Sequence, residues 1–172
     1  MAVSDALLPL DGAEDRPLAE AISFDVPGVP QPQGSTKAFK HKSSGRVIVT
    51  SDNARLRPWR DAVCWHARQA LAGRGPLAGP IAVVLKFRFA RHAGHFGKRG
   101  LRGAAPREHV VRPDLDKLAR GALDGLGEAG VWRDDAQVVE LVVRKSYGEA
   151  PGVRIEVGGH TAGQTTAGEG AA

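Results

Sequence analysis

The alternation of apolar and polar residues divides the middle of the chain into short strands. Residues 22–26 alternate between the two types, which is the period of a half-buried strand, and residues 46–50 are rich in β-branched residues. Residues 81–89 begin as a continuous apolar run, typical of an interior strand, and continue as alternating phenylalanine and base. Residues 138–143 and 153–157 predict two closing strands.

Two further segments have the spacing of helices. Apolar residues recur every three or four positions over 59–71 and again over 115–126. We expect the first helix to end near Gly73 and the second to be stopped by Gly125 and Gly127. The order of elements predicts a single mixed α/β domain with one mixed β-sheet and two main helices.

The composition of the two ends differs from that of the middle. Residues 1–20 are rich in Ala, Asp and Pro, and residues 158–172 are a low-complexity tail. We therefore expect a disordered lead, a folded domain over 21–157 and a disordered tail. The chain of 172 residues has one cysteine, which excludes an internal disulfide, and its apolar runs are too short to span a membrane. These features predict a cytoplasmic protein.

The charge pattern indicates a partner. The net charge is +5, yet residues 1–20 hold five acids against one base, so the rest of the chain is more basic than the total suggests. Residues 86–112 carry eight bases against the acid Glu108, and they include a 90–109 loop whose length suggests a function. A basic surface predicts a polyanion such as DNA. The bases are Lys86, Arg88, Arg91, Lys98, Arg99, Arg102, Arg107 and Arg112.

Carboxylates follow this basic stretch. Because Pro113 disfavours helix before it, we expect Asp114 and Asp116 to lie in extended chain on one face, with Leu115 in the core. The helix and its turn then return Asp135 toward Asp114. Carboxylates held side by side need a cation, and Mg²⁺ with a basic surface indicates phosphodiester hydrolysis. A chance Asp-x-Asp and a surface Asp-Asp turn remain open as alternatives.

Several motifs hold their order and spacing together over 112–145, and they resemble the RusA family of Holliday-junction resolvases. The resemblance implies a homodimer that cuts four-way DNA junctions by paired nicks. The reaction would need Mg²⁺, for which Mn²⁺ can substitute, and no small-molecule cofactor. The resemblance makes Asp114, Asp116 and Asp135 the catalytic and metal-binding carboxylates. The motifs are Asp114-Leu115-Asp116, Leu123-Asp124-Gly125-Leu126, Asp134-Asp135-Ala136-Gln137-Val138 and Lys145.

Two positions depart from the family pattern. Lys117 stands where the family has Asn, and Arg120 stands where it has an essential Lys. Arg keeps the positive charge and can hold phosphate, but it cannot transfer a proton as Lys can. We expect Arg120, Lys117 and Lys145 to hold the phosphate. If the family Lys transfers a proton, the alternative is a branched-DNA-binding protein whose nuclease has lapsed.

Other candidates lie outside the motifs. Phe96, between two glycines in the 90–109 loop, is a candidate wedge at a junction centre. His92 and His95 indicate phosphate contact or no role, and Asp124 is expected to pair with a base because its charge opposes the helix dipole. A third function, a less selective flap or replication-fork nuclease, has the same residues.

Overall fold

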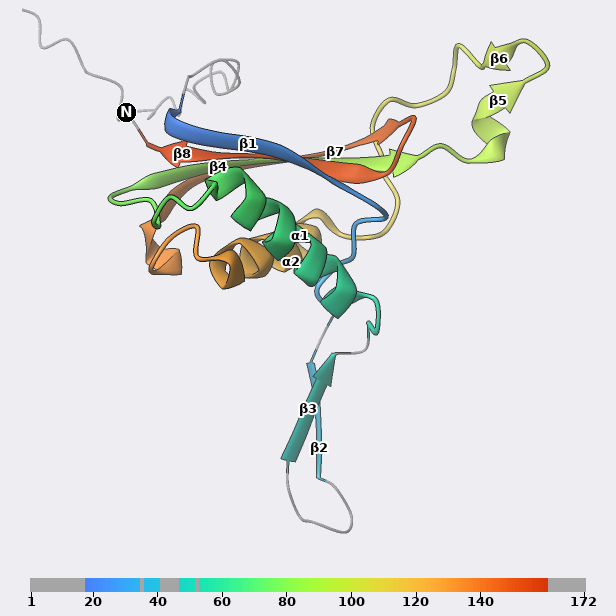
Figure 1. Ribbon diagram of the computed structural model, residues 1–172. Helices are drawn as coiled ribbons and strands as arrows, with labels where there is room; N and C mark the ends of the chain where they lie inside the picture. The colour runs from blue at the N-terminus through green and yellow to red at the C-terminus, as the bar shows by residue number, and fades with distance from the viewer. Residues whose placement is uncertain (1–17, 35, 41–46, 52, 161–172) are drawn as a thin grey trace, which may run out of the picture.

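The structure, a computed structural model, describes residues 18–34, 36–40, 47–51 and 53–160. A four-stranded sheet forms one layer, and among the described residues two helices pack against one of its faces (Figure 1). The predicted mixed α/β class with one main sheet and two main helices is confirmed.

The main sheet is mixed. Its strands are, in spatial order, β1 (Ala19–Pro27), β8 (Gly152–Gly159), β4 (Ile81–Ala90) and β7 (Val138–Gly148). Strand β8 is antiparallel to both of its neighbours, whereas β4 and β7 are parallel. Parallel neighbours need a crossover, and here the chain crosses through α2 (Leu115–Ala129). The apolar run of β4 is therefore an interior strand, as predicted.

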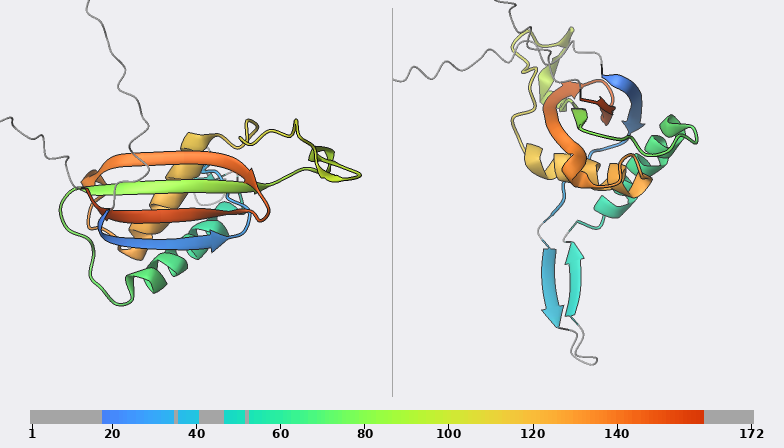
Figure 2. Two further views of the ribbon diagram at one scale, coloured as in Figure 1. Left: turned by 90° about the horizontal axis from the view of Figure 1, so that it is seen from above. Right: turned by 90° about the vertical axis from the view of Figure 1, so that its left-hand side faces the viewer.

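The core lies between the sheet and the helices. Helix α1 (Leu56–Leu71) runs beside α2 across the same face of the sheet (Figure 2). Alternate residues of β4 point into this layer, which confirms the strand period read from the sequence. The helix residues that meet them follow the predicted spacing of three and four. Buried core residues of β4 and α1 include Ile81, Val83, Leu85, Phe87, Phe89, Trp59, Val63, Ala67 and Leu71.

Ion pairs link neighbouring strands on the face of the sheet opposite the helices. Asp25 accepts hydrogen bonds from Arg88 at 2.8 Å and from Arg154 at 2.7 Å. Partial burial alone would raise the pKa of Asp25, but these two hydrogen bonds outweigh it and hold the pKa below its ordinary value. Lys86 lies 3.5 Å from Glu156. Two of the predicted DNA-contacting bases, Lys86 and Arg88, therefore lie in ion pairs on this face.

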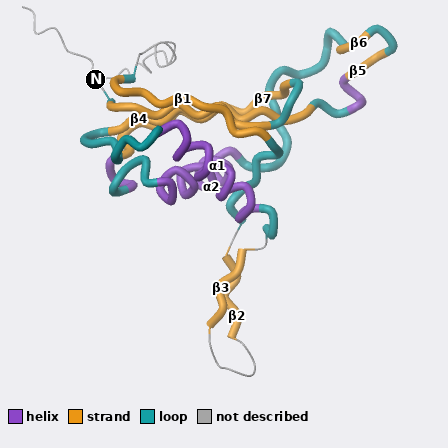
Figure 3. The backbone as a smooth tube through the Cα atoms, viewed as in Figure 1, coloured by secondary structure: helices purple, strands orange, loops and turns teal. Residues whose placement is uncertain are grey.

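Two hairpins project from the two-layer body. Strands β2 (Thr36–Lys40) and β3 (Val47–Ser51) pair antiparallel and stand away from it (Figures 1 and 3). Pairing with β3 gives the backbone groups of β2 their hydrogen-bond partners. Strands β5 (Phe96–Gly97) and β6 (Gly100–Leu101) form a second hairpin beyond the end of β4.

The main sheet contains the first and the last strand of the described chain. Strand β1 starts at Ala19 and β8 ends at Gly159. The expected disordered lead and tail fall largely on 1–17 and 161–172, which lie outside the described residues. No helix in the described part of the chain is long and apolar enough to cross a membrane.

Gly125 has a packing role rather than the predicted role of a helix stop. Helix α2 continues through Gly125 and Gly127 to Ala129, and it is capped by Gly130 in the left-handed conformation with φ 78°. A Cβ atom added to Gly125 would lie 2.9 Å from Cβ and Cγ1 of Val63. The expected early end is therefore wrong, because the absent side chain lets the two helices approach closely.

We expect Gly125→Ala to destabilise the fold by about 1–3 kcal/mol, since α1 and α2 must move apart to admit the methyl group. Urea unfolding followed by circular dichroism measures this change. Gly103→Ala is the control, because a Cβ there meets no atom within 4 Å. Equal stability of the two variants would show that the helices are not in close contact at Gly125.

Candidate active site

The first two candidate carboxylates lie at the start of α2. Asp114 is the N-cap residue, with extended backbone at φ −70° and ψ 144°, and Asp116 already lies in the first helical turn. The prediction of extended chain is therefore correct for Asp114 and wrong for Leu115 and Asp116, which already lie in the helix. Leu115 begins the helix and is 37% exposed instead of turning into the core. The helix starts early because the carbonyl of Asp114 already accepts from the N–H of Leu118 at 3.2 Å.

Asp114 forms an ion pair with Lys117. The Nζ atom of Lys117 lies 2.9 Å from Oδ2 of Asp114. This hydrogen bond and charge hold the pKa of Asp114 below its ordinary value, and they raise the pKa of Lys117 in return. Asp116 adds to the rise in the pKa of Lys117. The pair is thus charged at neutral pH. It is lost as the pH falls through the lowered pKa of Asp114 or as it rises through the raised pKa of Lys117.

Lys145 holds the backbone that leads into α2. Its ammonium group donates to the carbonyl oxygens of Val111 and Pro113, both at 2.8 Å. Lys145 lies on β7, beside Phe87 of β4. These contacts make Lys145 a positioning residue for the segment that carries Asp114, whereas the sequence suggested a direct contact with phosphate.

The segment between α2 and β7 carries the third carboxylate on a tightly bonded turn. Asp134 caps the short 3-10 helix Asp135–Gln137 by accepting from the N–H of Ala136 at 2.8 Å. The amide oxygen of Gln137 accepts from the N–H of Arg133 at 2.9 Å and from that of Asp134 at 3.2 Å. Its nitrogen donates to the carbonyls of Leu77 and Gly79, both at 3.1 Å. Gln137 therefore ties this turn to the loop before β4.

Asp135 is oriented by a buried tryptophan. The indole N–H of Trp132 donates to Oδ1 of Asp135 at 2.7 Å, and Trp132 is 4% exposed. A Cβ at Gly127 would lie 3.4 Å from the same oxygen, so the end of α2 closes on this carboxylate. The hydrogen bonds made by Trp132 and Gln137 were not predicted from the sequence. The proximity of these two residues to the Asp-Asp pair was the available signal, but their bonds run to partners that only the fold supplies.

A groove of about 370 Å³ runs along α2 beside the edge strand β7. We call it the α2–β7 groove. Asp116 lies toward its one end and Asp135 toward the other, with apolar side chains and Arg120 between them. The lining residues are Asp116, Ala119, Arg120, Leu123, Asp124, Trp132, Asp135, Val138 and Leu141.

The length of α2 keeps the two ends of this groove apart. Asp135 lies against Gly127, and Gly127 is roughly 16 Å along the helix axis from Asp116 at 1.5 Å per residue. The expected return of Asp135 to the side of Asp114 is therefore wrong within one chain. Among the described residues, no three carboxylate, imidazole or thiol groups are placed to hold one metal ion.

Asp124 has the basic partner that its position predicted. Its Oδ2 atom lies 3.4 Å from Nη1 of Arg60 on α1, and Arg60 also pairs with Glu128. This ion pair joins the exposed sides of the two helices. It explains how α2 tolerates an acid near its carboxyl end.

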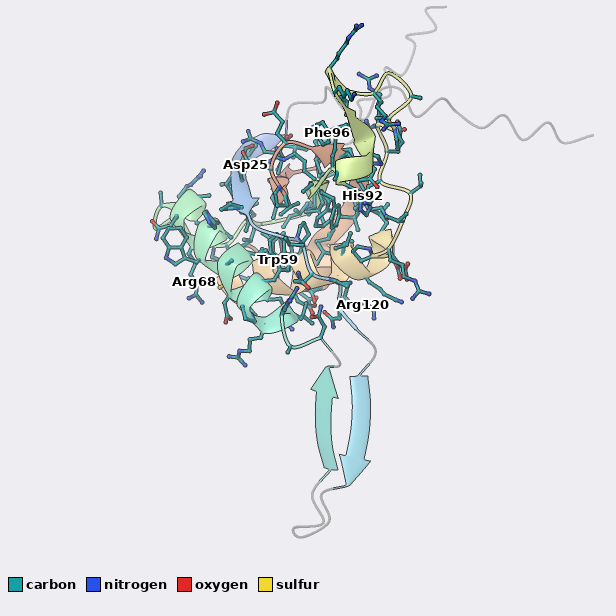
Figure 4. The ribbon with its side chains drawn as sticks, turned by 90° about the vertical axis from the view of Figure 1, so that its right-hand side faces the viewer. Asp25, Trp59, Arg68, His92, Phe96 and Arg120 are labelled. Atoms are coloured by element: carbon teal, nitrogen blue, oxygen red, sulfur yellow. The ribbon has the colours of Figure 1, made fainter. Side chains whose placement is uncertain are left out.

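The remaining predicted DNA-contacting bases lie mainly on an arm, residues 91–111, that extends from the end of β4 (Figure 4). Arg91 donates to the carbonyl of Pro106 at 2.8 Å, and Arg102 donates to that of Phe96 at 3.1 Å. Phe96 and Leu101 are cross-strand neighbours in the hairpin, 46% and 51% exposed. The arm thus carries a small apolar tip. Its bases are Arg91, Lys98, Arg99, Arg102 and Arg107, and Arg112 follows it.

Aromatic rings pack where the arm leaves the sheet. The rings of His92 and His95 are 4.8 Å apart, and each lies beside Tyr147 of β7. The Tyr147 hydroxyl is 3.3 Å from Nε2 of His92. His109 stacks on Phe89 at 4.2 Å. The two histidines that the sequence left open therefore anchor the base of the arm.

We expect Gln137→Ala to lower the free energy of unfolding by about 2 kcal/mol, because four backbone groups lose their side-chain partner. Hydrogen exchange should speed up at the amides of Arg133 and Asp134, which donate to Gln137. The exposed Gln69 of α1 offers the control variant Gln69→Ala. Unchanged exchange at both amides would contradict the role assigned to Gln137.

Comparison with known proteins agrees with this architecture. The family model for endodeoxyribonuclease RusA matches residues 27–158, which include strands β4 and β7, nearly all of β8, both helices and the three candidate carboxylates, and which begin at the end of β1. The chain is 29% identical over 117 residues to the crossover junction endodeoxyribonuclease RusA of Escherichia coli strain K12, which covers 68% of this chain and 78% of that protein.

Two other relatives extend the comparison. The Shigella sonnei protein of the same name is 28% identical over the same length, with the same shares covered. The uncharacterized protein YqaN of Bacillus subtilis strain 168 is 38% identical over 48 residues, or 28% of this chain and 33% of that protein. Because the family model spans most of the chain, this protein belongs to the RusA family of endodeoxyribonucleases.

Proposed function

We propose that this protein is a Mg²⁺-dependent endonuclease that resolves four-way DNA junctions by paired nicks, in recombination and repair. Relatives that match most of the chain are named crossover junction endodeoxyribonucleases. The basic arm with its apolar tip suits a branched DNA, because cations hold phosphates and an exposed aromatic ring can enter between bases. Phe96 is the proposed wedge.

The observation that carries the proposal is that Asp116 and Asp135 line the same groove from different turns of α2, Asp116 from the first turn and Asp135 from beside Gly127 near the last. In a two-fold dimer, a contact from one end of a surface is repeated from the other end. A two-fold axis through the apolar middle of the groove would bring Asp135 of the partner subunit toward Asp114 and Asp116. We therefore propose a homodimer whose two sites each take carboxylates from both subunits.

Such a site fits a divalent cation. Mg²⁺ prefers oxygen ligands and uses one or two carboxylates with waters and phosphate oxygens, and Mn²⁺ accepts a similar set. Asp114, Asp116 and Asp135 of the partner subunit would hold it. The bound ion would lower the pKa of a coordinated water and neutralise charge on the phosphate.

The remaining polar groups of the proposed site position the carboxylates or neutralise charge on the phosphate. Asp114 holds Lys117, so a cation that takes over this carboxylate would free the ammonium for the phosphate. Arg120 lies one helical turn beyond Asp116, in the same groove, and can hold phosphate oxygens with two N–H groups. Lys145 keeps the backbone before Asp114 in place through its two carbonyl contacts. Trp132 holds the carboxylate of Asp135 in place through its indole N–H.

We expect the purified protein to cut a labelled four-way junction symmetrically in the presence of Mg²⁺, and EDTA to abolish cutting. Asp116→Asn should slow cutting by at least about a hundredfold while junction binding persists, since a metal ligand contributes several kcal/mol. Asp61→Asn, on the exposed side of α1, is the control. Tight junction binding without cutting by the unaltered protein would favour a DNA-binding protein whose nuclease has lapsed. Equal cutting of linear duplex would favour a less selective flap or fork nuclease.

The shared site has its own test. Asp116→Asn and Asp135→Asn should each be inactive alone, and a mixture that has exchanged subunits should nick junctions again. The reason is that a mixed dimer carries both substitutions in one site and leaves the other intact. Gel assays of nicked junction before and after subunit exchange measure the recovery. Continued inactivity of a mixture shown to contain mixed dimers would sink the shared site.

A further inference from the structure

A second groove lies on the other side of the α2 N-terminus. It has a volume of about 670 Å³ and is lined by residues 29–32 after β1, by Asn53 and Arg55 before α1, by Phe89, and by residues 112–114 with Lys117. We call it the proline groove. Cavities of about 300–1,000 Å³ are the size that holds a small organic ligand such as a nucleotide. The β1 segment is fixed to α2, because the N–H of Gln33 donates to the carbonyl of Lys117 at 2.9 Å.

The walls of the proline groove are largely apolar. Three prolines and Phe89 line it beside Val29, which is 55% exposed. The ring of Phe89 is supported by His109, stacked at 4.2 Å. An apolar wall of this kind can pack against the flat face of a nucleobase, as the apolar walls of ligand pockets do. The prolines are Pro30, Pro32 and Pro113.

The rim of the same groove is basic. Arg55 and Arg112 line it from two different segments, and both side chains are exposed. In the described part of the chain, neither arginine lies in an ion pair, whereas Lys117 is paired with Asp114. Two guanidinium groups beside an apolar wall match a phosphate joined to a base.

Two amide side chains, Gln31 and Asn53, also line the groove. The Nδ2 atom of Asn53 donates to the carbonyl of Pro32 at 3.1 Å and to Oε1 of Gln31 at 3.3 Å. The Nε2 atom of Gln31 donates to the carbonyl of Val29 at 2.9 Å, which leaves its second N–H for another acceptor. An amide held in this way offers a directed donor to a base edge.

The proline groove also shares residues with the proposed catalytic site. Asp114 and Lys117 line it, while Asp116, two residues further on, lines the α2–β7 groove. A strand whose phosphate lies at Asp114 and Asp116 therefore has its neighbouring nucleotide beside the proline groove.

We propose that the proline groove is a nucleotide subsite, which takes the unstacked nucleotide next to the scissile phosphate and selects the sequence that is cut. This inference rests on the proposed function. The base lies against the wall of Val29 and the prolines, Gln31 donates to its edge, and Arg55 and Arg112 hold the adjoining phosphate.

The test maps cut positions on a set of four-way junctions that differ in the nucleotides flanking the branch point. The unaltered protein should prefer one nucleotide at a fixed position, and Gln31→Ala should reduce that preference by about tenfold, the usual effect of one lost base contact. Gln69→Ala, on the exposed side of α1, should keep it. An unchanged preference in Gln31→Ala would overturn the inference.

A second measurement does not depend on cutting. With Asp116→Asn bound to the junction, 2-aminopurine at the selected position should become more fluorescent as the base leaves the stack. Arg55→Ala should reduce this rise and weaken junction binding. No rise at any position flanking the cut would overturn the subsite. A failure of the unaltered protein to cut any junction would instead overturn the proposed function, because this signal needs no cutting.

Discussion

The rigidity of α2 is the constraint on which the rest of the site depends. An α-helix of 15 residues cannot fold back on itself, so residues at its two ends are held apart by its length. Asp116 begins this helix and Asp135 packs against its last turn. The same rigidity gives the α2–β7 groove a carboxylate toward each end. That arrangement is useful to a two-fold assembly, in which opposite ends of one surface meet.

Much of the motif that marks the family serves to position groups rather than to react. Gln137 bonds to four backbone groups, and Trp132 holds one oxygen of Asp135. Lys145 fixes the backbone before α2 from a strand that lies more than thirty residues later in the chain. In the proposed site, a carboxylate that binds a metal ion and a phosphate works best when its side chain is already held in one conformation, since preorganised groups need no rearrangement.

The strands and helices were predictable because burial imposes a period on the sequence. Strand β4 alternates between core and open face, and α1 repeats every three or four residues, as each element must if one face is buried. The predictions that were wrong concern residues whose role depends on a neighbour. Gly125 looked like a helix stop, yet it admits Val63 of α1. Leu115 was expected in the core, yet it begins α2 and is 37% exposed.

The sequence by itself determined the class of the fold, the family and the residue types of the site. Asp114, Asp116 and Asp135 stand in motifs whose order and spacing can be recognised from the sequence alone. The tertiary structure alone decided where these carboxylates lie, since the distance between two residues depends on the rigid element between them and not on the number of residues. It also decided that the α2 N-terminus borders two grooves. The segments that complete the proline groove come long before α2 in the sequence, and only the fold brings them beside it.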